Sequence, residues 1–129
     1  MKESFLSFYP LLYLLLPLGF IIGSIPFGIL VTKNKGIDLR TTGSKNIGAT
    51  NVLRTAGKLP ALITLLGDVF KGSAPVMICN YIIANINHSA VNAELINTAK
   101  DFWGGLAGLS AIAGHIFSIF LSFNSFFNF

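Results

Sequence analysis

The chain has 129 residues, of which 53% are hydrophobic and 11% are charged, and its formal net charge is +4. An ordinary soluble domain has about 25% charged residues, so a water-soluble enzyme is excluded because too few charges are present to cover its surface. A disordered or nucleic-acid-binding tail is excluded as well, since such a tail needs high charge and few apolar residues. The composition predicts an all-α integral membrane protein with a single membrane domain over residues 1–129.

Three stretches are apolar and long enough to cross a bilayer, which requires about 20 residues. Residues 5–32 carry no charge, residues 59–84 are interrupted by Asp68 and Lys71, and residues 102–123 form the third stretch. The first is interpreted as a retained helix and not as a signal peptide, because its apolar run is long and its positive charge follows it. The sequence therefore predicts about three transmembrane helices.

The basic excess of the chain lies between the first two stretches. Residues 33–58 contain six cations and one anion. Cytoplasmic loops are enriched in Lys and Arg, so we expect this loop in the cytoplasm. The N-terminus and residues 85–101 then lie outside. In a bacterial inner membrane that outer side is the periplasm, and composition alone leaves other membranes open.

Two glycine pairs predict close helix packing, because glycines four residues apart allow two helix backbones to approach each other. They are Gly19 with Gly23 and Gly104 with Gly108.

Residues 36–54 combine residue types that suit a phosphate group. Glycines allow turns whose N–H groups converge on an anion, hydroxyls add donors, and arginine offers a planar fork to phosphate oxygens. A helix beginning at Ala49 would add its positive N-terminal dipole and place Asn51 and Arg54 on one face. A solvated loop whose polar residues only make turns is the alternative. The polar and glycine residues concerned are Gly36, Thr41, Thr42, Gly43, Ser44, Lys45, Asn46, Gly48, Thr50, Asn51 and Arg54.

Four segments carry a resemblance to a known family: GSIPFG at residues 23–28, GSKNIGATNVLR at 43–54, DVFKG at 68–72 and GHIF at 114–117. They resemble the bacterial acyl-phosphate:glycerol-3-phosphate acyltransferase family of multi-pass inner-membrane enzymes. The likeness runs from about residue 20 to residue 121, and the long segment 43–54 makes it specific.

The resemblance implies an acyltransferase. Its reaction moves an acyl group from acyl phosphate to the 1-hydroxyl of glycerol 3-phosphate, giving 1-acylglycerol 3-phosphate (lysophosphatidate) for phospholipid synthesis. The implied partners are acyl phosphate, glycerol 3-phosphate and the lipid bilayer, with no nucleic acid. No cofactor and no metal are expected.

The resemblance also implies site residues. Ser44 and Arg54 match the family's serine and arginine that act in substrate phosphate binding and activity, and are the expected catalytic residues. The expected substrate-binding residues are Gly43, Asn46, Gly48, Asn51 and Lys71.

The chain departs from the family after residue 117. Residues 121–129 are rich in Phe and Asn where the family has a Gly- and Lys-rich motif, Ser118 stands where the family has a proline, and a third motif is absent. We therefore expect a C-terminally truncated or frame-shifted member, a fragment of a larger polytopic helical bundle. Such a chain would be inactive or incomplete on its own, and a second, C-terminal chain could complement it.

Polar residues within the apolar stretches leave two interpretations open. Asp68 and Lys71 are three residues apart and share a helix face, where they either neutralise each other structurally or draw an anionic substrate toward the membrane. A lone His115 on an apolar helix is more often a packing residue than a catalyst. A small transporter or channel subunit for an anionic solute, and a non-catalytic assembly protein, are the alternative functions.

Overall fold

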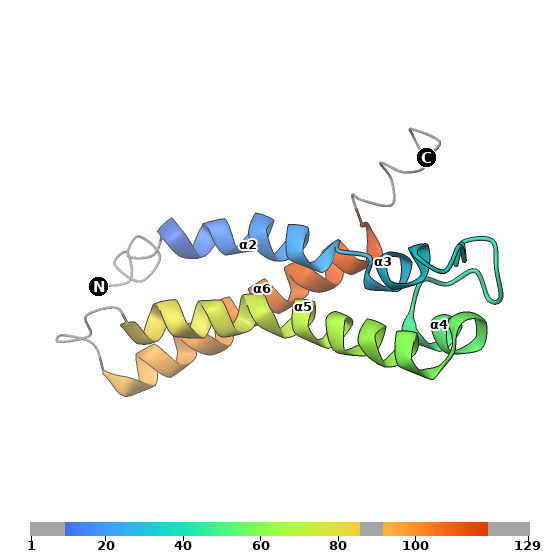
Figure 1. Cartoon of the computed structure of the whole chain (residues 1–129). Coiled ribbons are helices and arrows are strands. Elements are labelled where there is room, and N and C mark those ends of the chain that lie inside the picture. The colour runs from blue at the N-terminus through green and yellow to red at the C-terminus, as the bar shows by residue number, and fades with distance from the viewer. Residues whose placement is uncertain (1–9, 86–91, 119–129) are drawn as a thin grey trace.

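The computed structural model describes residues 10–85 and 92–118, and all the regular secondary structure in these ranges is helical. Helices α2, α5 and α6 lie lengthwise beside one another, with α5 antiparallel to the other two (Figure 1). Helices α3 and α4 and the loop between them lie at one end of this bundle. The helices are α2 Pro10–Gly23, α3 Phe27–Lys33, α4 Ala49–Ala56, α5 Lys58–Asn85 and α6 Ala93–Ile116.

The first apolar stretch forms two helices where the sequence predicted one over residues 5–32. The chain leaves the helix after Gly23 and resumes it at Phe27. Pro26 has no N–H to donate, so one helical hydrogen bond is missing at this break, although α2 and α5 accommodate Pro17 and Pro75 in their interiors. The Ser24 hydroxyl donates to the Phe20 carbonyl at 2.7 Å, which satisfies one of the acceptors at the end of α2. Residues 5–9 lie outside the described ranges.

Two helical segments are long and apolar enough to cross a membrane, residues 10–33 and α5. The outward side of α5 is covered by large apolar side chains that a soluble protein would bury. Examples are Leu62, Leu66, Phe70, Met77 and Tyr81. This surface is compatible with lipid contact.

The third predicted stretch, residues 102–123, is not among the two candidate spans in the described part of the chain. Helix α6 begins at Ala93, earlier than predicted, because the Asn92 side chain accepts the Leu95 N–H at 2.8 Å and caps the helix. Its first turns therefore include Glu94, Lys100 and Asp101, which lower its hydropathy. Residues 119–123 lie outside the described ranges.

Helices α2 and α6 touch through their backbones. A methyl group on Gly23 would overlap the Ala111 carbonyl, and one on Gly114 would overlap the Phe20 carbonyl. The predicted pair Gly19 and Gly23 thus faces α6. The other predicted pair, Gly104 and Gly108, lies instead against Val76 of α5, so α6 uses different small residues for each neighbour.

We expect Gly23→Ala to destabilise the bundle by about 1–3 kcal/mol, because the added methyl must push α2 away from α6. The fluorescence of the single tryptophan reports this packing, since Trp103 of α6 is buried and its ring lies edge-on to Tyr13 of α2, 4.8 Å between centroids. Thermal unfolding in detergent measures the change. Gly105→Ala is the matched control, because nothing lies within 4 Å of its added methyl. Equal midpoints for the two variants would contradict the close α2–α6 contact.

Candidate functional site

One buried side chain organises the loop between α3 and α4. Asn51, in the first turn of α4, is 1% exposed. Its Oδ1 accepts the Ser44 N–H at 3.0 Å, and its Nδ2 lies 2.7–3.3 Å from three loop carbonyl oxygens. These carbonyls belong to Leu39, Thr42 and Asn46. The amide of Asn51 is therefore fully engaged by loop backbone, and its function in the site is to hold the loop in shape.

Gly43 is required by this arrangement. Its φ is +64°, in the left-handed region, and a methyl group there would overlap the Asn51 side-chain oxygen. Gly48, in contrast, has φ −77° and ψ 165°, an ordinary extended conformation at the N-cap of α4. The positive φ that a glycine allows is therefore not used at Gly48. Lys45 adopts the positive φ instead, at 61°.

The loop exposes several polar side chains, among them those of Ser44, Lys45 and Asn46. The Asn46 side chain accepts the Gly48 N–H at 3.0 Å, which closes a turn just before α4. Helix α4 begins at Ala49, as the sequence predicted. The loop thus exposes a hydroxyl and an ammonium shortly before the start of a helix in the chain.

The two arginines of the chain differ in what they contact. The Arg40 side chain donates to Asp38 at 3.1 Å, and this bond holds the pKa of the Asp38 carboxyl below its ordinary value. The Arg40 guanidinium is thus already paired with a carboxylate. Arg54 is exposed and near the end of α4, and the described part of the chain offers it no ion pair. Arg54 is therefore the arginine available to an anion.

A small apolar core fixes the loop to α5. Leu39 of the loop, Val52 of α4 and Ala61 of α5 are buried against one another. Gly28 of α3 approaches the loop as well, since a methyl there would overlap the Ile47 carbonyl. The loop is consequently held from three sides.

Lys71 is 4% exposed, in contrast to the exposed side chains of Ser44 and Lys45. Its ammonium forms an ion pair with Asp68 at 2.6 Å and donates to the Ile25 carbonyl at 2.8 Å. That carbonyl lies in the break between α2 and α3. A buried ammonium needs such partners, so the geometry favours a structural function for Lys71 over direct substrate contact.

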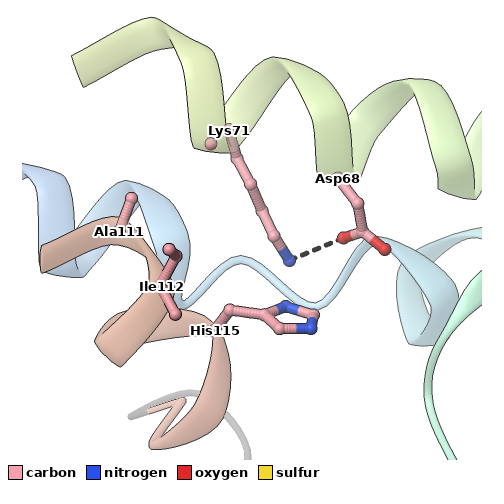
Figure 2. A pocket seen from close by; sticks show the side chains of 6 residues that line it. Asp68, Lys71, Ala111, Ile112 and His115 are labelled. Atoms are coloured by element: carbon pink, nitrogen blue, oxygen red, sulfur yellow. Dashed lines mark ion pairs between the residues drawn. The ribbon is translucent and has the colours of Figure 1, made fainter. Parts of the chain in front are cut away.

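Two hollows meet at His115. The loop hollow, of about 430 Å³, is lined by Ser44, Lys45, Asn46, Ile47, His115 and Ile116. The ion-pair hollow, of about 180 Å³, is lined by Asp68, Lys71, Gly72, Ala111, Ile112 and His115. Figure 2 shows the His115 ring reaching from the end of α6 toward the Asp68–Lys71 pair. In the described ranges no group of three His, Cys, Asp or Glu side chains could hold a metal ion.

The structure therefore brings Ser44 and Asn46 together, and adds His115, which sequence reasoning interpreted as a packing residue. The signal for His115 was weak, because its neighbours come from segments about 45 and 70 residues earlier in the chain. Arg54 does not line either hollow; it is exposed in the last turn of α4.

Comparison with known proteins matches residues 13–125 to the family described as glycerol-3-phosphate acyltransferase. The glycerol-3-phosphate acyltransferase of Geobacter metallireducens is 44% identical over 110 residues, 85% of this chain and 49% of that protein. That of Bradyrhizobium sp. is 47% identical over 107 residues, 82% of this chain and 46% of the relative. The chain thus spans about half the length of the curated relatives it matches. No solved structure is significantly similar, and nothing supports the transporter alternative.

We expect Asn51→Ala to release the loop, because one side chain holds four backbone groups and leaving them unsatisfied costs about 1–3 kcal/mol. Hydrogen–deuterium exchange of the backbone amides of residues 36–48 should accelerate roughly 10- to 100-fold. The largest effect is expected at the Ser44 amide, whose hydrogen bond to the Asn51 side chain is lost. Asn34→Ala, at an exposed asparagine just after α3, is the control and should leave exchange unchanged. Unchanged exchange in Asn51→Ala would show that the loop is ordered by other contacts.

Proposed function

The chain belongs to the glycerol-3-phosphate acyltransferase family, and on this premise we propose that it binds glycerol 3-phosphate on the loop 43–48 and acts in its acylation by acyl phosphate. The observation that supports this most is the loop itself. Its backbone is fixed by Asn51, while Ser44, Lys45 and Arg54 remain exposed and able to contact phosphate oxygens.

In the proposed reaction, the 1-hydroxyl oxygen of glycerol 3-phosphate attacks the acyl carbon of acyl phosphate. A carbon–oxygen ester bond forms, and the bond between the acyl carbon and the phosphate oxygen breaks. Its electron pair leaves with inorganic phosphate, and the hydroxyl proton is given up to a base. No redox change occurs, so the residues need only position the reactants and neutralise charge.

The site residues divide into two groups in this proposal. The Ser44 hydroxyl donates a hydrogen bond to the substrate phosphate, and the Arg54 guanidinium donates two parallel hydrogen bonds to it. Gly43, Asn46, Gly48 and Asn51 shape the loop that carries these groups. Lys71 acts at a distance, by holding the α2–α3 break through the Ile25 carbonyl.

We further propose that the chain is a single membrane domain with three crossings in a bacterial inner membrane. The cations of residues 33–58 support a cytoplasmic loop. Glycerol 3-phosphate is soluble and acyl phosphate carries an apolar chain, so a site at the end of a membrane bundle is accessible to both. The N-terminus then lies outside.

Glycerol 3-phosphate binding by the full chain in lipid nanodiscs tests the loop. We expect Arg54→Ala to weaken binding roughly 10- to 100-fold, because a charge-assisted contact contributes about 1.5–3 kcal/mol. Arg54→Lys should restore it poorly, since an ammonium cannot form the bidentate fork.

Arg40→Ala is the matched control, because Arg40 is an exposed arginine of the same basic segment that is already paired with Asp38. It should change binding by less than about twofold, within the range of exposed ion pairs. Equal losses in the two variants would mean that the segment attracts anions only through its net charge.

Cysteine labelling tests the orientation. In a Cys79→Ser background, Lys45→Cys should react with a membrane-impermeant thiol reagent only from the cytoplasmic side, and Asn92→Cys only from the outside. Both positions are exposed. The reverse pattern would contradict the orientation and place the loop away from the proposed cytoplasmic substrates.

A further inference from the structure

Cations outnumber acids at the end of the bundle that holds the loop. In the described residues 27–72 the two acids, Asp38 and Asp68, are each bound in an ion pair with a basic side chain. Of the other cations in this range, two are assigned to the substrate phosphate by the proposed function. The remaining cations are exposed lysines that the proposed function does not use: Lys33, Lys35 and Lys58.

The fold brings Lys33 and Lys58 to a similar depth along the bundle. Helix α3 packs on α5 and runs in the opposite direction (Figure 1). A methyl group on Gly67 would overlap the Phe27 ring, so the beginning of α3 lies beside Gly67. Because both helices rise about 1.5 Å per residue, Lys33 at the end of α3 lies within about one turn of the level of Lys58 at the start of α5.

Lys35 lies at the same junction. Its ammonium donates to the Ala56 carbonyl at 3.4 Å, which is one of the last carbonyls of α4 and lies two residues before Lys58 in the chain. The end of a helix carries a partial negative charge, which attracts an ammonium. The three lysines therefore lie around the point where α3, α4 and α5 meet.

Exposed leucines lie one turn from two of these lysines, on the side toward the middle of the bundle. Leu30 precedes Lys33 by three residues on α3, and Leu62 follows Lys58 by four residues on α5, so each pair shares a helix face. Leu62 is also at the beginning of the apolar outward side of α5. Lysines at the edge of an apolar surface lay their aliphatic stems along it and place the ammonium among lipid headgroups.

We propose that Lys33, Lys35 and Lys58 bind the phosphate headgroups of anionic phospholipids at the membrane surface; this goes beyond the proposed function and does not depend on acyl transfer. The phosphate of such a lipid is held at the depth of the ammoniums because its acyl chains lie against the exposed leucines. A free phosphate offers the same charge but has no chains to hold it there. A zwitterionic phospholipid has the chains, but its own cation opposes the lysines.

Lipid binding at these lysines has a structural consequence for the loop. The junction of α3 and α5 supports the loop through the buried contacts of Leu39 and Gly28. Headgroups bound at this junction would hold the loop 43–48 at the membrane surface. A soluble molecule and a molecule dissolved in the bilayer could both reach it there.

The local lipid preference is measured by the quenching of an introduced tryptophan with brominated lipids. The chain has one tryptophan, so Leu62→Trp in a Trp103→Phe background places the only indole one turn from Lys58. We expect brominated phosphatidylglycerol to associate there about three- to tenfold more strongly than brominated phosphatidylcholine in low salt. Raising the salt concentration should lower this ratio. A ratio near one in low salt would overturn the proposal.

Two variants separate a defined surface from the net charge of the segment. Lys58→Gln should lower the ratio at least about twofold, because each lysine near the surface contributes to anionic lipid binding. Arg40→Gln removes the same charge from the same segment, but this guanidinium is paired with Asp38, so the ratio should stay within about 1.5-fold. Equal losses in the two variants would overturn the proposal.

The unmodified chain provides a second measurement that needs no substitution in the core. Native mass spectrometry from micelles that contain both lipids should show phosphatidylglycerol retained in preference to phosphatidylcholine. The double variant Lys33→Gln, Lys58→Gln should lose this preference. Glycerol 3-phosphate, added at matched ionic strength, should leave the retained phosphatidylglycerol in place. Equal retention of the two lipids, or displacement of phosphatidylglycerol by glycerol 3-phosphate, would overturn the proposal, and the second result would assign these lysines to a soluble phosphate.

Discussion

A single buried amide holds the candidate site together. The Asn51 side chain forms hydrogen bonds that water would otherwise form, with the Ser44 N–H and with three carbonyls of a loop that has no regular secondary structure. Neutral hydrogen bonds contribute about 0.5–1.5 kcal/mol each, and their loss in a buried position costs more. Because Asn51 is also in the first turn of α4, the same residue ties the loop to the start of this helix.

The surrounding bundle depends on a second buried polar contact. Pro26 breaks the first apolar stretch, and the Lys71 ammonium satisfies the Ile25 carbonyl at that break. Asp68 neutralises the charge that would otherwise be costly in an apolar setting. With α3 displaced from the axis of α2, Gly28 reaches the Ile47 carbonyl and supports the loop from behind. The break, the ion pair and the loop are thus one connected arrangement at one end of the bundle (Figure 1).

Local features were predictable from the sequence and long-range ones were not. The helix starting at Ala49 and the left-handed Gly43 follow from local patterns. The break at Pro26 was obscured by a long stretch without any charged residue, and the early start of α6 depended on the cap at Asn92. Spacing indicated the pairing of Lys71 with Asp68, whereas its second partner is a backbone carbonyl 46 residues away, which no spacing rule indicates. His115 looked isolated because its neighbours, Ser44 and Asp68, are brought to it only by the fold.

The central claim, that a substrate phosphate lies on the loop beside Arg54, has a direct measurement. Solid-state NMR of the ¹⁵N-arginine-labelled chain, in a phosphate-free sugar detergent, can detect dipolar coupling between guanidinium nitrogens and the phosphorus of glycerol 3-phosphate. The chain has two arginines, Arg40 and Arg54, so an Arg40→Lys sample assigns the signals. We predict ³¹P dephasing at Arg54 and none at Arg40. Dephasing at Arg40 alone, or at neither arginine in a sample with bound glycerol 3-phosphate, would contradict the account.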